Sequence, residues 1–288
     1  MFKIIRYLFE LFIFIFFFSI FSLLPLNLSR KCGIFLSVNL GRYTSTNKII
    51  KKNLGIAFPS KSQDWLERTT KDVWINFGKV VGEYSHIKEL ANKKNQKIKI
   101  IENSYSESFF NNSNKKILIS SHNANWEVPG IACKIKSNSI SGIVREPNNP
   151  FIKFFLSRIR SKYSVKCYEK NMLGTKMLIK DFNNGNSIAL LADQQITTGL
   201  EVTFFGKSVK STKLPAQLAL KSKSDIYLAW PRRHGDDFEF EFYQPIKSSL
   251  LENNEHNIQK IVNQINEFFE RQISISPSEY FWHHNRWK

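Results

Sequence analysis

The stretch Lys115-Lys-Ile-Leu-Ile-Ser-Ser-His-Asn-Ala-Asn-Trp-Glu127 joins a short apolar run to a polar turn and then to the start of a helix. The apolar run is rich in β-branched residues and is bounded by polar ones, which predicts a buried strand. The serine and asparagine residues that follow supply turn and helix-capping side chains. We therefore expect His122 on a loop at the carboxyl end of a strand, where open α/β sheets place their ligands.

The spacing of His122 and Glu127 suggests acid–base chemistry. A histidine can take a proton from a hydroxyl when one ring nitrogen is free, and a carboxylate on the other nitrogen fixes its tautomer. Five positions across a strand–turn–helix corner can bring the two side chains together, so we expect a catalytic pair. The alternative is a polar corner in which Glu127 only stabilises the helix N-terminus.

Strand-like and helix-like segments alternate along the rest of the chain. Apolar runs typical of strands lie at 98–101, 117–120, 139–144, 187–192, 226–230 and 238–242, and helical periodicity at 63–92, 128–134, 177–182 and 250–272. This alternation predicts an α/β fold with a mixed sheet flanked by helices.

The N-terminal segment is dense in phenylalanine and almost continuously apolar from residue 7 to residue 24. A secretory signal peptide would need a small-x-small cleavage site, which is absent, and a lipoprotein signal would need small residues before Cys32. We therefore expect one uncleaved N-terminal membrane-anchor helix within residues 1–28, followed by a catalytic domain at 29–288.

Composition limits the function classes. The formal net charge of +18 and the pI of about 9.7 indicate an acidic partner, which could be nucleic acid, an anionic membrane surface, or an acidic protein or substrate. The three cysteines include no Cys-x-x-Cys, so we expect no disulfide framework, no zinc site and a reducing compartment. No serine-nucleophile, P-loop, dinucleotide or His-Glu-x-x-His motif is present, so we expect neither a cofactor nor a metal.

Further polar residues follow the strand-like runs or lie on the helices. Arg145 follows the run at 139–144, and Asp193 follows the run at 187–192, which is again the ligand position. Arg158 and Arg160 lie on a helix, where the simple alternative is surface charge. Arginine suits a bidentate grip on phosphate or carboxylate groups.

Several of these motifs resemble one enzyme family. His122-Asn-Ala-Asn-Trp-Glu127 resembles the His-x4-Asp/Glu signature of the glycerolipid and lipid A acyltransferases. The wider pattern is most similar to the late (lauroyl/myristoyl) acyltransferases of lipid A synthesis. Its other parts are Asn53–Pro59, Arg145–Pro150, Arg158-Ile-Arg160, Asp193-Gln194, Val202–Gly206 and Tyr280–Lys288. Glu146, between Arg145 and Pro147, departs from the family motif.

The resemblance implies a glycerolipid-acyltransferase fold and a reaction. An acyl chain would pass from acyl carrier protein to a hydroxyl of a lipid A precursor, with His122 as the base and Glu127 orienting it. Substrate-binding positions carried over from the motifs are Arg145, Arg158, Arg160 and Asp193. The arginines would hold phosphates or steady the thioester, and Asp193 would position a hydroxyl or pair with an arginine.

The resemblance also implies partners and a location. The partners would be an acyl carrier protein, an anionic glycolipid acceptor and the membrane, with no nucleic acid. The catalytic domain would lie on the cytoplasmic face of the bacterial inner (plasma) membrane. Two alternatives stay open: an acyltransferase for another lipid, such as a lysophospholipid or a glycolipid, or a non-catalytic, basic, membrane-tethered lipid-binding protein.

Overall fold

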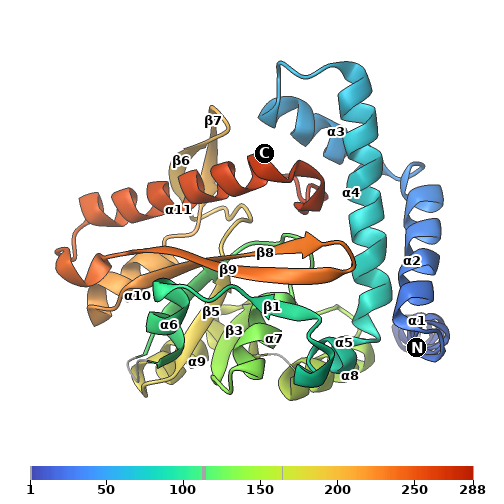
Figure 1. Ribbon diagram of the computed structural model, residues 1–288, viewed down its shortest axis with the longest axis horizontal. Helices are drawn as coiled ribbons and strands as arrows, with labels where there is room; N and C mark the ends of the chain where they lie inside the picture. The colour runs from blue at the N-terminus through green and yellow to red at the C-terminus, as the bar shows by residue number, and fades with distance from the viewer. Residues whose placement is uncertain (1, 112–114, 164, 288) are drawn as a thin grey trace.

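A mixed sheet forms the centre of the molecule (Figure 1). The structure is a computed structural model that describes residues 2–111, 115–163 and 165–287, so Lys288 of the C-terminal motif lies outside the described residues. Within these residues seven strands pair in the order β1-β9-β8-β2-β5-β3-β4, antiparallel only between β8 and β9. The strands are β1 (Ile98–Ile100), β2 (Ile117–Ser120), β3 (Ile140–Val144), β4 (Lys166–Glu169), β5 (Ser187–Leu191), β8 (Ile226–His234) and β9 (Asp237–Ile246).

Strand β2 lies inside the sheet with both of its faces covered. Ile117 and Ile119 belong to one apolar core and Leu118 to the other, and all three are fully buried. Alternating side chains of a strand point to opposite faces, so a continuous apolar run fits this central position. Figure 1 shows α11 along one side of β8 and β9, with α6 and α7 on the other side.

Helices cover the two faces unequally. The larger core lies under α9 (Met172–Asn183), α10 (Leu214–Ser222) and α11 (Glu255–Ile275). The smaller core lies under α6 (Ser104–Asn111), α7 (Val128–Ile135) and one side of α8 (Pro150–Tyr163). Shorter elements are α5 (Ile87–Leu90), η1 (Lys93–Asn95), η2 (Ser248–Leu250), η3 (Pro277–Glu279) and a separate hairpin of β6 (Leu200–Phe204) and β7 (Lys207–Ser211).

Four helices at the N-terminal end stand beside the sheet: α1 (Phe2–Leu23), α2 (Leu26–Gly41), α3 (Ser45–Ala57) and α4 (Gln63–Tyr84). Figure 1 shows α2 and α4 side by side, next to the carboxyl end of β8. Glycines allow this close approach: a Cβ atom at Gly33 would lie 2.1 Å from the Gly78 carbonyl oxygen, and one at Gly82 would lie 2.5 Å from the Ser29 carbonyl oxygen.

The predicted fold class is confirmed, because the sheet is mixed, helices flank it and an apolar helix begins the chain. Strand β2 has the predicted bounds, and α4 ends at Tyr84, earlier than residue 92. Helix α1 is the one helix among the described residues that is long and apolar enough to cross a membrane. The division into an anchor at 1–28 and a catalytic domain at 29–288 stays a prediction.

Candidate active site

The loop after β2 holds His122 in a defined position. The backbone of Ala124 is left-handed, with φ of 48°, which turns the chain sharply after His122. The C-terminal segment fixes this turn, since the N–H of Phe281 donates to the His122 carbonyl at 2.9 Å and the N–H of Ala124 donates to the Glu279 carbonyl at 2.9 Å. His122 therefore lies at the carboxyl end of β2, as predicted.

His122 pairs with Asp193. The Nδ1 atom of His122 lies 2.8 Å from Oδ1 of Asp193, whose side chain is only 2% exposed. The contact follows from the sheet, because β2 and β5 are parallel neighbours and the Ala192 N–H donates to the Ser120 carbonyl. Burial raises the pKa of Asp193, but the charge and hydrogen bonds of His122 and the charge of Arg286 outweigh it and lower the pKa below its ordinary value.

The other ring nitrogen of His122, Nε2, makes no contact with Asp193. A carboxylate only accepts hydrogen bonds, so Nδ1 carries the proton and Nε2 is the free acceptor. The described contact of Nε2 is the side-chain amide of Gln194, at 3.4 Å. The rings of Trp126 and Phe281 stand about the imidazole, with centroids 6.1 and 6.0 Å away. This arrangement suits a general base that meets a substrate hydroxyl at Nε2.

The structure does not show the expected hydrogen bond between His122 and Glu127 among the described residues, and a catalytic role of Glu127 stays a prediction. Glu127 precedes α7 and binds Arg160 on α8, with 2.9 Å between Oε1 and the guanidinium Nε. The Asn125 side chain accepts a hydrogen bond from the backbone N–H of Glu127 and so fixes the start of the helix. The carboxylate that orients His122 in this structure is that of Asp193, and Glu127 belongs to a neighbouring ion pair.

The ion pair of Glu127 and Arg160 is largely buried, with side-chain exposures of 6% and 13%. Burial lowers the pKa of Arg160, but the charge of Glu127 outweighs it and the pKa is raised. Tyr84 approaches the same carboxylate at 3.4 Å, and its pKa is raised by burial and by the charge of Glu127. An uncompensated charge here would be costly, which explains why Glu127 turns toward Arg160.

The remaining predicted binding residues lie elsewhere. Arg145 follows β3 and is exposed, and Arg158 is exposed on α8 with its guanidinium over the Phe154 ring at 5.4 Å. Neither has an ion-pair partner among the residues that the structure describes. The structure thus brings together His122 with Asp193 and Glu127 with Arg160, and the substrate-binding roles of Arg145 and Arg158 stay predictions. Across residues 2–111, 115–163 and 165–287, no three His, Cys, Asp or Glu side chains are grouped so that they could hold a metal.

A buried network under the His122 loop was not assigned a role from the sequence. Glu83 is fully buried and binds Arg233 through two hydrogen bonds, of 2.7 and 3.0 Å. It also accepts from Arg30 at 2.8 Å and from Asn125 at 2.9 Å. Glu83 lies within the helix predicted at 63–92, and no local pattern of the sequence connects it with Asn125.

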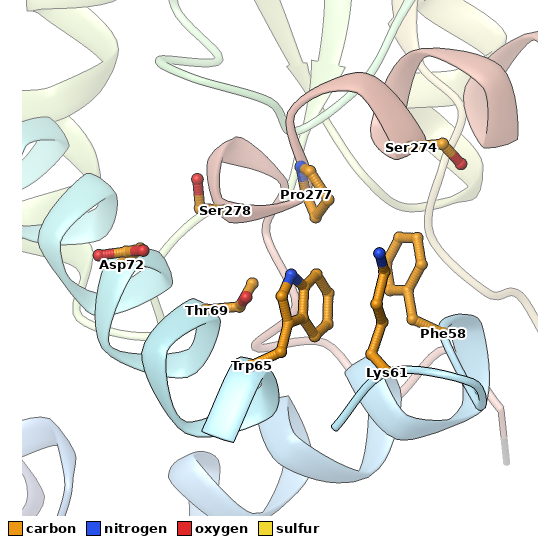
Figure 2. Close-up of a pocket in the computed structure, with 8 residues that line it drawn as sticks. All are labelled: Phe58, Lys61, Trp65, Thr69, Asp72, Ser274, Pro277 and Ser278. Atoms are coloured by element: carbon orange, nitrogen blue, oxygen red, sulfur yellow. The ribbon is translucent and has the colours of Figure 1, made fainter. Parts of the chain in front are cut away.

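A separate cavity of about 250 Å³ opens between the α3–α4 corner and the end of α11. Figure 2 shows the rings of Phe58 and Trp65 on one side, with the Lys61 side chain between them. Neither His122 nor Asp193 lines this cavity. Its lining residues are Phe58, Lys61, Trp65, Thr69, Asp72, Ser274, Pro277 and Ser278.

Comparison with known proteins identifies the chain's relatives. All of it, residues 1–288, matches the model of a family described as bacterial lipid A biosynthesis acyltransferase. No curated protein matches it. Among solved structures, the crystal structure of the 1-acyl-sn-glycerophosphate (LPA) acyltransferase PlsC from Thermotoga maritima is similar at 11% sequence identity and a TM-score of 0.39. That comparison covers 85% of this chain and 98% of that one.

Proposed function

Because the chain belongs to the bacterial lipid A biosynthesis acyltransferase family, we propose that it transfers a fatty acyl chain from an acyl carrier protein to a hydroxyl of a lipid A precursor. The family supports acyl transfer in general, and the donor and acceptor are part of the proposal. The observation that carries it is the pair of His122 and Asp193, with the Nε2 atom of His122 available to a hydroxyl.

In the proposed reaction, the acceptor hydroxyl takes the place of the Gln194 amide at Nε2 of His122. His122 removes the hydroxyl proton while the oxygen attacks the thioester carbonyl carbon, and Asp193 stabilises the imidazolium that forms. The tetrahedral intermediate then collapses, the carbon–sulfur bond breaks, and His122 returns the proton to the departing thiolate. The ester and a free carrier thiol are the products.

The exposed arginines and the net charge of the chain fit these substrates. Arg145 and Arg158 are exposed and available to phosphate groups, and the net charge of +18 favours both an acidic carrier protein and an anionic glycolipid. Arg160 is already paired with Glu127 and would steady the site more than it would bind a phosphate. We place the chain at the cytoplasmic face of the bacterial inner membrane, held by its N-terminal helix.

Mass spectrometry of lipid A tests the proposal, after expression of the full chain in a host that lacks its own late acyltransferases. We expect a gain of one acyl mass that His122→Ala abolishes, whereas the same change at the exposed His256 preserves it. No gain from a folded, membrane-associated protein would overturn the lipid A acceptor and would direct attention to a lysophospholipid or another glycolipid. A gain that survives His122→Ala would overturn the mechanism.

A further inference from the structure

Helix α1 is docked lengthwise on the catalytic domain. The Asn149 side chain donates to the Tyr7 carbonyl at 2.8 Å and to the Glu10 carboxylate at 3.0 Å. Further along, the Phe155 ring contacts Phe14 and Phe18, with centroids 5.5 and 4.9 Å away. These contacts place α8 beside several turns of α1, so α1 is more than a tether joined at its C-terminal end.

The end of α1 is also fixed. Phe21 is buried, and its carbonyl oxygen lies 2.9 Å from Nε2 of His86, at the start of α5. The segment of α1 from Tyr7 to Phe21 is about 21 Å long, at 1.5 Å per residue. This length is a large part of the thickness of a bilayer's hydrocarbon core, which is roughly 30 Å. Lipid that covers the outer face of α1 therefore also reaches the helix packed beside it.

The first turns of α8 and α9 expose large apolar side chains at this place. Phe151 and Phe154 are 43% and 62% exposed, and Met172 and Leu173 are 77% and 67% exposed. The two turns meet at Glu169, the last residue of β4.

The contacts at Glu169 come from both helices. Lys153 of α8 binds its carboxylate at 2.8 Å. Gly174 of α9 packs so closely on its backbone that an added Cβ would lie 2.0 Å from the carbonyl oxygen. The four apolar side chains therefore surround one corner of the sheet, at its carboxyl edge.

Positive charge surrounds these apolar side chains. Between residues 145 and 180 the sequence has nine lysine and arginine residues against two glutamates. Arg145, Arg158, Lys170 and Lys176 are exposed. Apolar side chains bordered by basic ones are typical of a surface that rests on an anionic lipid leaflet, where each nearby cation adds about 1 kcal/mol of attraction.

We propose that the first turns of α8 and α9 are a second membrane contact, which enters the interface of an anionic leaflet beside α1. Lipid is the occupant because this surface continues from the exposed apolar face of α1 across the Phe155 contact. The His122 loop lies at the same carboxyl edge of the sheet, so a lipid could reach His122 without leaving the leaflet. Lipid binding here does not depend on the acyl-transfer proposal.

The test measures the lipid depth of single labelled positions in the full chain. Cys32 is exposed and is replaced by serine, Cys133 is buried, and burial raises the pKa of Cys167 to about 12, so neither remaining thiol competes for the label. Phe154→Cys and Leu173→Cys each receive an environment-sensitive nitrobenzoxadiazole label. The protein is then reconstituted into vesicles of phosphatidylethanolamine and phosphatidylglycerol, with or without spin-labelled lipid.

Leu250→Cys is the matched control. Leu250 is 82% exposed but lies in η2, at the opposite edge of the sheet, after the end of β9. We expect spin-labelled lipid to quench the labels at 154 and 173 and to leave the label at 250 bright. Phe151→Cys and Met172→Cys repeat the measurement at neighbouring exposed positions if either first variant fails to fold.

Equal, weak quenching at all three positions would overturn the proposal, because α1 would then hold the domain away from the lipid. The proposal would also be overturned if spin-labelled lipid does not quench the labels at 154 and 173 but acyl carrier protein changes their fluorescence in detergent. That result would show that the surface binds acyl carrier protein.

Discussion

Glu83 and Arg233 join through two hydrogen bonds beneath the loop that carries His122. Glu83 also pairs with Arg30. Burial alone would raise the pKa of Glu83, but the charges of Arg233 and Arg30 outweigh burial, so the pKa lies below its ordinary value. Through Asn125 the same carboxylate contacts the His122 loop itself. The site therefore rests on a buried charge network that spans α2, α4 and β8.

Glu83→Gln should destabilise the protein by about 3–5 kcal/mol, because it leaves two buried arginines without a compensating charge. Thermal unfolding in detergent would measure the loss. Glu67→Gln is the control, since Glu67 pairs with Lys51 at an exposed position, and it should change stability by less than about 1 kcal/mol. Equal stability of the two variants would contradict the structural role of Glu83.

Glu127 and Arg160 should act as a unit. Glu127→Gln leaves the Arg160 charge buried, and Arg160→Gln leaves the Glu127 charge buried, so each single change should lower activity and stability. The double variant removes both charges and should lose less than the sum of the two, with a coupling of about 0.5–3 kcal/mol. Additive losses in a double-mutant cycle would show that Glu127 works independently of Arg160.

The stability of the fold should decrease at acidic pH because of the buried side chain of His283. Burial lowers the pKa of His283 from 6.5 to about 4, and the ring stacks on Phe281. At a pH between these two pKa values, His283 is protonated in the unfolded chain and neutral in the folded one. The free energy of unfolding therefore falls by up to about 1.4 kcal/mol for each pH unit as the pH drops below about 6.5. His283→Phe should flatten this loss in unfolding curves measured between about pH 5 and about pH 7.5. The control His256→Phe, at an exposed position, should leave the pH dependence of stability unchanged. If the loss of stability at low pH persists in His283→Phe, His283 is not its cause.

A single methyl group added at the α2–α4 interface should destabilise the protein. At Gly78 an added Cβ would lie 2.6 Å from the Gly33 carbonyl oxygen, so Gly78→Ala should destabilise by about 1–3 kcal/mol. At Gly55, within α3, an added Cβ meets nothing within 4 Å, and Gly55→Ala should stabilise by up to about 1 kcal/mol through helix propensity. Melting temperatures that move in the same direction would contradict the close packing.

The sequence predicted those parts of the fold whose pattern is local. The continuous apolar run of β2 and the helical stripe of α4 both have the positions expected from their periodicity. Helices α2 and α3 were not predicted, because their residues are mixed and basic and α2 gains its packing from glycines that meet a distant helix. Strand β4 has an edge position, and Tyr168 is the one buried residue among its four, which gives a weak apolar signal.

The site was predicted less completely than the fold. The local pattern predicts His122 and Asp193 at the carboxyl ends of two strands, as the structure has them, but it does not encode that β2 and β5 are neighbours. The short spacing of His122 and Glu127 in the sequence predicts a pair between them. The structure instead turns Glu127 toward Arg160, since a buried guanidinium requires a counter-charge.

The turnover number of Asp193→Asn tests the central claim most directly, measured with purified protein, acyl carrier protein substrate and lipid acceptor. Asparagine keeps the size of the side chain but can hold the wrong tautomer of His122, so we expect kcat to fall by roughly 10⁴-fold, as such a change does in a Ser-His-Asp triad. Asp236→Asn, at an exposed position, should leave kcat unchanged. Retention of most of the activity in a folded Asp193→Asn variant would contradict the assignment of Asp193 as the residue that orients His122.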